Sequence, residues 1–288
     1  MDLRVGTTPM AIMSNFIFGK VESKNPSGSI RDRVVEYILN SLKNENKIKI
    51  GSELITIATN EFAVSFAHFC AKKGYKAHII TNESMNEQHK NICNVYGAEL
   101  YEFEGFSYEK LLKKKNDFNK LNTKLINVDL YRKDMSTKAY ALSISSELKH
   151  QIQVHGKNLK RIFLFNEPDF LAETMLKEFP NVELFNVRIK NSLFTFNKTK
   201  RDVVNNINLF PEKEINTKIF QKELSINLEK VVENIQKVAS SSGLIMDYRT
   251  SALYLVAKEY ICFNNDINLI FFYENGERYL DEIYSFKK

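Results

Sequence analysis

The 288-residue sequence has no tryptophan, only three cysteines and five prolines, and ten glycines that are unevenly spread. No glycine occurs between Lys157 and Ser242. Glycine-rich loops bind phosphate because their backbone amides can approach the ligand closely. A loop of that kind is therefore excluded from this long stretch of the chain.

The cysteines Cys70, Cys93 and Cys262 are far apart, odd in number and without metal-ligand spacing. This pattern argues against a disulfide framework and against a metal site, and it fits a reducing compartment. No apolar run reaches the roughly 18 residues of a membrane span. The N-terminus also lacks a charged region followed by an apolar core. The sequence therefore predicts a soluble, cytoplasmic protein without a membrane segment.

Positive charge is in small excess. The chain has 41 Lys and Arg residues and 35 Asp and Glu residues, which gives a net charge of +6. The densest basic run, residues 113–115, has no accompanying aromatic-basic motif. This favours a solvated surface over a nucleic-acid site. The motifs of serine hydrolases, P-loop and dinucleotide-binding proteins and zinc proteases are also absent.

Apolar runs typical of buried strands alternate with helical segments of roughly 10 to 15 residues along the chain. This alternation predicts an α/β fold with mostly parallel sheets and helices on both faces. We expect strands at residues 16–22, 53–58, 124–130, 162–165, 180–188 and 267–273, and helices at 30–42, 62–73, 106–120, 137–150, 228–240 and 251–260.

Residues 25–33, Asn-Pro-Ser-Gly-Ser-Ile-Arg-Asp-Arg, form a turn that opens a helix. They resemble the lysine-bearing turn of the cysteine synthase family, which belongs with cystathionine beta-synthase to the pyridoxal-phosphate enzymes of fold type II. Residues 5–10, Val-Gly-Thr-Thr-Pro-Met, are similar to the family's early turn. Residues 276–280, Gly-Glu-Arg-Tyr-Leu, are similar to its C-terminal signature, so the resemblance spans nearly the whole chain.

The resemblance implies two α/β domains of the tryptophan synthase beta-like type with a cleft between them. Residues 29–126 would form the smaller domain, and residues 1–28 plus 127–288 the larger one. It also implies a homodimer. Cysteine synthases bind the C-terminal tail of serine acetyltransferase in the active-site cleft, so a peptide or a regulator is a further possible partner.

The turn departs from the family at one residue, because Arg31 stands where the family has the lysine that holds pyridoxal phosphate as a Schiff base. A Schiff base needs a neutral amine, and a guanidinium with a pKa above about 12 supplies none. Lys20 and Lys24 are nearby substitutes, although their spacing singles out neither. Arg31 itself is either a surface or cleft arginine or an anion-binding residue.

Three other segments that face the cofactor or substrate in the family differ here. Residues 58–63, Ala-Thr-Asn-Glu-Phe-Ala, replace the substrate-carboxylate loop, with Glu61 at the position of the family's asparagine. Residues 166–170 replace the phosphate loop, and Arg249 enters the turn that meets the pyridine nitrogen, where Thr250 or Ser251 still offers a hydroxyl. In the simpler interpretation, Thr59 or Asn60 caps a helix, and Glu167 and Asp169 lie in the first turn of another.

We therefore predict a cysteine synthase-like pseudoenzyme that has no catalytic residue, binds no cofactor, and binds a protein partner, an active paralogue or a ligand in the former active-site cleft. The residues expected to line that cleft, besides Arg31, are Asn25, Ser27, Ser29, Thr59, Asn60, Glu61, Glu167, Asp169, Arg249 and Thr250. Two alternatives stay open. One is an enzyme with different chemistry built on Arg31, Glu61, Glu167 and Asp169, and the other is an active cysteine synthase that uses another lysine.

Overall fold

The computed structural model describes residues 4–104, 108–165, 169–190, 193–196, 199–202 and 219–285. The chain divides into two compact units. Unit 1 contains Met1–Ile30, Tyr140–Asn205 and Glu214–Lys288, and unit 2 contains Arg31–Ala139 and Asn206–Lys213. The first boundary therefore falls within the turn that carries Arg31.

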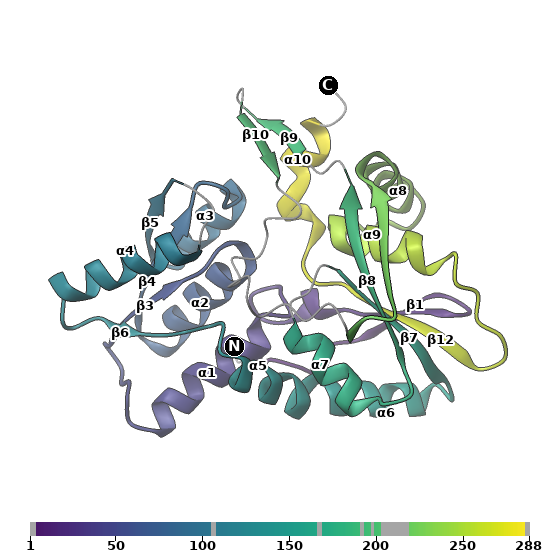
Figure 1. Cartoon of the computed structure of the whole chain (residues 1–288), viewed down its shortest axis with the longest axis horizontal. Helices are drawn as coiled ribbons and strands as arrows, with labels where there is room; N and C mark the ends of the chain where they lie inside the picture. Colours follow the sequence, from purple (N-terminus) through teal and green to yellow (C-terminus); the bar gives the residue numbers. More distant parts are fainter. Residues whose placement is uncertain are drawn as a thin grey trace. The chain divides into compact units, whose positions relative to one another are not determined.

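Unit 1 is built on a six-stranded sheet with the order β1-β2-β12-β7-β8-β11 (Figure 1). Its strands are β1 (Met10–Ser14), β2 (Ile17–Lys20), β7 (Asn158–Phe165), β8 (Glu183–Lys190), β11 (Lys222–Asn227) and β12 (Asp266–Phe271). Only β1 runs antiparallel to its neighbour, and the other pairs are parallel. The second half of β7, Ile-Phe-Leu-Phe, is wholly buried. A strand that is covered on both faces buries every side chain, and its sequence is therefore an unbroken apolar run.

Helices cover both faces of this sheet, with α8 and α9 on one side and α6 and α7 on the other (Figure 1). The regular elements are α6 (Ser146–Val154), α7 (Asp169–Glu178), α8 (Leu228–Ser242), α9 (Tyr248–Ala257) and α10 (Leu280–Ser285), with short turns η1 (Glu22–Lys24), η2 (Ala141–Ser145) and η5 (Gly276–Tyr279). Two further strands, β9 (Leu193–Phe196) and β10 (Thr199–Asp202), pair as an antiparallel hairpin.

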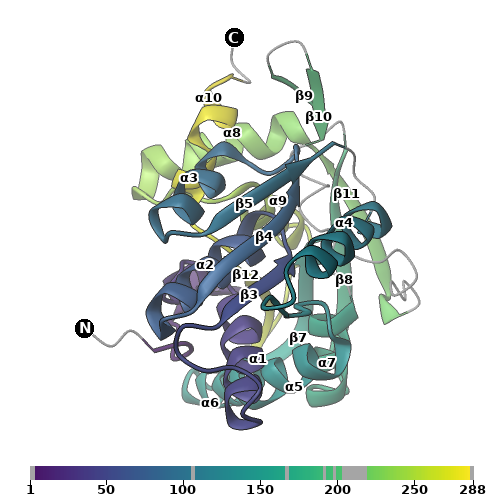
Figure 2. The same ribbon diagram turned by 90° about the vertical axis from the view of Figure 1, so that its left-hand side faces the viewer.

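Unit 2 has a four-stranded, wholly parallel sheet with the order β5-β4-β3-β6 (Figure 2). Its elements are α1 (Asp32–Asn44), β3 (Glu53–Ile57), α2 (Asn60–Lys73), β4 (Lys76–Asn82), α3 (Glu87–Val95), β5 (Glu99–Phe103), α4 (Tyr108–Leu121), β6 (Ile126–Asn127) and α5 (Lys133–Tyr140), whose last residue belongs to unit 1. Helix α4 packs on β3 and β4, and its Leu111 joins Ile55, Ile57, Ile80 and Leu125 in one apolar cluster.

The structure confirms the α/β fold with mostly parallel sheets, but two expected elements differ. The strand expected at residues 124–130 is only the two-residue β6. The helix expected at residues 137–150 is not α-helical throughout, because η2, a short π-helix, lies between α5 and α6. No proline or glycine marks this interruption in the sequence, so local composition gives no signal for it. None of the described helices is long and apolar enough to cross a membrane.

His68 on α2 is a half-buried residue of unit 2 with an unusual environment. Its ring makes edge contacts with Phe69 and Tyr96, at centroid distances of 4.9 and 5.2 Å. Neither of its ring nitrogens has a hydrogen-bond partner among the described residues. Burial, helped by the nearby Lys72 charge, lowers the pKa of His68. The folded protein therefore resists protonating this ring.

This predicts an acid sensitivity that a single substitution removes. The unfolded chain protonates His68 below a pH of about 6.5, whereas the folded chain does not, so stability from this site is lost as pH falls through that value. His68→Phe should flatten the decrease in thermal unfolding temperature between neutral and mildly acidic pH, measured by circular dichroism. His150→Phe, at an exposed position, is the matched control. Parallel pH profiles for the wild type and His68→Phe would contradict the assignment.

Candidate functional site

Arg31 occupies the N-cap position of α1, and its carbonyl accepts the first helical hydrogen bonds, from the amides of Val34 and Val35. The next residue, Asp32, accepts a hydrogen bond of 2.6 Å from the Ser65 hydroxyl of α2. This bond joins the two helices directly beside residue 31. The prediction that this turn begins a helix is therefore confirmed. The hydrogen bonds of the Arg31 carbonyl and of the Asp32 side chain fix the start of that helix.

The Arg31 side chain is only 2% exposed, which excludes the surface-arginine interpretation. Its Nε lies 3.8 Å from Glu61 Oε2, and its guanidinium carbon lies 4.9 Å from the centre of the Phe62 ring. Glu61 is equally buried. A buried cation is tolerated when an acid and an aromatic face lie beside it. The two residues that depart from the family at positions 31 and 61 therefore contact each other.

The loop before α2 places its polar groups differently from the expected cap. Thr59 is the N-cap residue, but its side chain makes no capping bond, and its buried Oγ1 meets no hydrogen-bond partner among the described residues. Asn60 has a φ of 44° and uses its Oδ1 to accept the amide of Asn86, at 2.9 Å. The prediction that Thr59 or Asn60 caps the helix is therefore confirmed in position for Thr59, although no side-chain capping bond forms. The left-handed conformation is kept without glycine because asparagine tolerates it better than most residues do.

Tyr131, which the sequence did not single out, completes this part of unit 2. Its ring meets Phe62 at 5.2 Å and Tyr108 at 5.8 Å, both edge to face. Burial raises the pKa of Tyr131, and the positive charge of Arg31 offsets this only in part. The phenol is therefore neutral at ordinary pH. Arg31, Glu61 and three aromatic rings form one cluster, which we call the Arg31 cluster.

In unit 1, Arg249 belongs to a second buried ion-pair network rather than to an open turn. Asp247 is the N-cap of α9, and its Oδ1 lies 3.1 Å from Arg249 Nε. Arg249 Nη2 lies 3.6 Å from Glu274 Oε2, and the guanidinium lies 5.0 Å from the centre of the Tyr273 ring. Glu274 also pairs with Arg278 Nη1. The cation is compensated, because Asp247, two residues before it, and Glu274, distant in the sequence, both lie beside it.

The hydroxyls expected beside Arg249 are already engaged. Thr250 Oγ1 donates to Asp247 Oδ2 at 2.5 Å, and Ser251 Oγ donates to the Val231 carbonyl at 3.0 Å. Gly276 explains part of the C-terminal signature, since a Cβ there would lie 2.6 Å from the Ile245 carbonyl oxygen and from backbone atoms of Met246. This part of unit 1 is a tightly packed scaffold.

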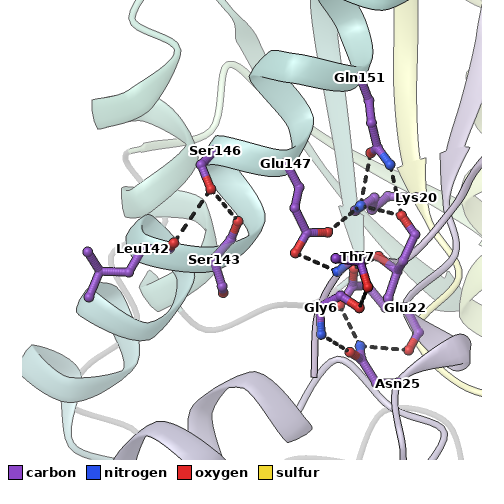
Figure 3. A network of polar contacts seen from close by, with 11 residues as sticks. Gly6, Thr7, Lys20, Glu22, Asn25, Leu142, Ser143, Ser146, Glu147 and Gln151 are labelled. Carbon is purple, nitrogen blue, oxygen red and sulfur yellow. Dashed lines mark hydrogen bonds and ion pairs between the residues drawn. The ribbon is translucent and has the colours of Figure 1, made fainter. Parts of the chain in front are cut away.

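A third polar network surrounds Asn25 in unit 1 (Figure 3). The side-chain Nδ2 of Asn25 donates to Glu22 Oε2 at 2.8 Å, and its Oδ1 accepts a hydrogen bond from the backbone N–H of Gly6 at 2.9 Å. Lys20, at 0% exposure, donates to the Thr8 carbonyl and to Glu147 Oε2, both at 2.7 Å. Its ammonium is therefore held in an ion pair.

The remaining candidates near this turn have other environments. Ser27 accepts from Arg278 Nη2 at 2.5 Å through its carbonyl, and Ser29 forms a backbone bridge with Glu274, so both hold the turn against the C-terminal segment. Lys24 is exposed. Glu167 lies outside the described residues, and α7 begins at Asp169, whose side chain is not described.

The candidates thus fall into two groups. Arg31, Thr59, Asn60 and Glu61 come together in unit 2, whereas Asn25, Ser27, Ser29, Arg249 and Thr250 belong to networks of unit 1. The described residues contain no group of three or more His, Cys, Asp or Glu side chains placed to hold a metal ion. The cleft itself and its lining stay a prediction.

The fold and these networks define a two-unit α/β protein with mostly parallel sheets. A family model described as "Pyridoxal-phosphate dependent enzyme" matches residues 1–164, more than half of the chain. The chain therefore belongs to the family of pyridoxal-phosphate dependent enzymes.

The relatives agree with this assignment. Cysteine synthase of Staphylococcus aureus is 24% identical over 300 residues, which cover 98% of this chain and 96% of that protein. Cysteine synthase B of Salmonella typhimurium is 26% identical over 107 residues, 35% of each chain.

Two solved structures share the fold. A lysine-to-alanine variant of O-ureido-L-serine synthase, bound to O-ureido-L-serine, gives a TM-score of 0.81 at 15% identity and covers 98% of this chain and 92% of that one. A hydrogen sulfide-producing enzyme from Fusobacterium nucleatum gives a TM-score of 0.77 at 18% identity, over 96% of this chain and 97% of that one.

The prediction that no cofactor is expected is wrong, because the family to which the chain belongs depends on pyridoxal phosphate. The described residues fit such a ligand in part. Thr59 carries a buried hydroxyl without a protein partner, which is a suitable non-covalent contact for a polar ligand. Covalent attachment fits less well, because Arg31 has no amine and the Lys20 ammonium is held by Glu147.

The network of unit 1 makes a direct stability prediction. Glu274→Ala should lower the free energy of unfolding by about 3–5 kcal/mol, because it leaves the buried Arg249 without one acid partner and removes the partner of Arg278. Urea denaturation followed by circular dichroism measures this. Glu277→Ala, an exposed acid three residues away, is the matched control and should change stability little. Equal losses in the two variants would show that the network is not stabilising.

Proposed function

We propose that this chain is a cysteine synthase-like pseudoenzyme that works by binding: it holds its ligands, the cofactor included, without the family's covalent lysine chemistry. The observation that carries this proposal is the Arg31 cluster. Residue 31 is a guanidinium buried against Glu61 and Phe62, at the position that resembles the family's cofactor lysine. A guanidinium binds anions well and cannot act as an amine nucleophile.

The contact between positions 31 and 61 supports this proposal. A lysine at position 31 beside the Glu61 carboxylate would be held in its charged form, because a nearby opposite charge favours the ion. A charged ammonium forms no Schiff base. Glu61 therefore disfavours the amine chemistry that Arg31 excludes outright, and we interpret the two residues as one change.

A structural neighbour adds support for ligand binding without a lysine. The O-ureido-L-serine synthase variant lost one lysine to alanine, yet it is described as bound to an amino acid. In our chain, the Thr59 hydroxyl is available for such a polar ligand. The alternative of an active enzyme using Lys20 is disfavoured by the ion pair between Lys20 and Glu147.

The paired nature of the change gives a sharp test. After unbound pyridoxal phosphate has been removed, borohydride should fix the cofactor stoichiometrically to no single lysine of the wild type, as measured by mass spectrometry. Arg31→Lys alone should behave in the same way, because Glu61 keeps the new amine charged. Arg31→Lys combined with Glu61→Asn should form the covalent bond, with an absorbance band at about 410 nm from the conjugated imine.

Each result separates the possibilities. Covalent cofactor on a lysine of the wild type would show an active-enzyme type of site and overturn the proposal. No retention of pyridoxal phosphate by the wild type in equilibrium dialysis would overturn the non-covalent part of it. If Arg31→Lys alone acquires the band, Glu61 has no role in suppressing the amine.

We propose that the protein partner is a second copy of this chain, joined through β1. This strand lies at the edge of the unit 1 sheet, is partly or fully exposed along its length, and has four apolar side chains among five residues (Figure 1). Ile12 is 61% exposed and lies opposite Phe18, which contacts His155 beside the 67% exposed Val154. An apolar edge strand can pair with itself about a two-fold axis.

Ile12→Lys should therefore convert a dimer to a monomer in sedimentation velocity, because it places a charge in the centre of the paired edge. Ile50→Lys, which changes an isoleucine of unit 2 that is 83% exposed, should leave the dimer intact. A monomeric wild type, or a dimer that survives Ile12→Lys, would refute the β1 contact. Purification from native cells as a complex with an active paralogue or a regulator would replace the second copy by that partner.

A further inference from the structure

A groove of about 590 Å³ lies on the surface of unit 1. Its walls come from the second half of α6, the first residues of β7, the end of α7 and the turn that leads into β8. All of these segments belong to unit 1 and to the described part of the chain. The volume is within the range of about 300–1,000 Å³ that is typical of small-molecule sites.

The groove is separate from the Arg249 network. It contains Asn158 and Leu159, the first residues of β7, whereas the Arg249 network adjoins Phe271, the last residue of the parallel strand β12. Parallel strands place all their amino ends at one edge of the sheet. The length of β7 puts the two edges roughly 23 Å apart. A ligand in this groove therefore would not contact the Arg249 network.

The floor of the groove is apolar. Ile152 and Val182 are almost fully buried, and Leu159 and Phe179 complete the lining. Such a surface suits the hydrocarbon part of a ligand, since burying apolar area is favourable and needs no special geometry.

The two lysines that line the groove differ in whether a carboxylate compensates their charge. Lys149 lies 2.6 Å from Glu178 Oε2 and 5.7 Å from the centre of the Phe179 ring, so its charge is compensated. Lys157 makes no ion pair within the described ranges of the chain. Gln153 and Asn158, which carry carboxamides, also line the groove. One uncompensated cation with neutral hydrogen-bond donors is suited to one anionic group.

The helix ends limit the charge of that group. Both α6 and α7 end at the groove, and the carbonyl end of a helix carries partial negative charge. A phosphate dianion would be repelled by both ends, whereas a single carboxylate beside Lys157 is less affected. The charges therefore select a monoanion.

We propose that this groove binds a small monocarboxylate with an apolar body, whose carboxylate meets Lys157 and whose body lies on Ile152, Leu159 and Val182. This is a second ligand site of the chain, built wholly from residues of unit 1.

The test uses 4-phenylbutyrate as the probe, with the full-length protein, in isothermal titration calorimetry. Its uncharged amide, 4-phenylbutyramide, has the same apolar body and reports the contribution of the carboxylate. Lys157→Gln removes the cation, and Lys177→Gln removes an exposed lysine of α7 that does not line the groove. Unfolding temperatures of both variants establish that they are folded.

We expect 4-phenylbutyrate to bind the wild type and Lys177→Gln with the same affinity. Lys157→Gln should weaken this binding by about tenfold, the usual value of a hydrogen bond to a charged group, and the amide should bind the wild type about tenfold more weakly. Absence of binding by the wild type overturns the proposal. Equal binding by the two lysine variants, or equal affinity for the acid and the amide, also overturns it.

Discussion

Buried positive charge is the physical constraint on which the interior of this protein depends. Lys20, Arg31 and Arg249 are each at most 2% exposed, and each lies beside at least one carboxylate: Glu147, Glu61, and Asp247 with Glu274, respectively. Removing a charge from water is costly unless a partner compensates it. The turns that carry these cations are fixed by that requirement, because each cation can occupy its place only where its acid is.

The same constraint changes how the departures from the cysteine synthase pattern are understood. In the sequence, Glu61 and Arg249 look hostile to an anionic substrate or to a ring nitrogen, and each seems to be a separate loss. In the structure, Glu61 neutralises Arg31, and Arg249 is neutralised within its own unit. These residues form internal ion pairs in place of isolated charges. The charged residues that depart from the family pattern are therefore paired with each other or with neighbouring acids. Membership of the family makes pyridoxal phosphate an expected ligand.

Local patterns identified most of the fold. The strands β3, β7, β8 and β12 and the helices α1, α2, α8 and α9 lie where apolar periodicity and turn residues placed them, because long regular segments have strong signals. The misses have non-local causes. Asn60 resembles a helix cap in sequence, but its side chain binds the amide of Asn86, which a different strand and helix bring near. The π-turn at Ala141–Ser145 leaves no mark in composition.

The candidate site was predictable only at the level of residue chemistry. That residue 31 has no amine follows from its identity, since a guanidinium stays protonated in any fold. The order of strands and helices also followed from the sequence by itself, and the resemblance of residues 5–10, 25–33 and 276–280 indicated the family. Only the tertiary structure decided which charges meet. Lys20 and Glu147 are 127 residues apart, and Tyr131 reaches Phe62 from another element, so no local pattern could pair them. Ion pairs depend on distance in space, and that distance is set by the folded chain.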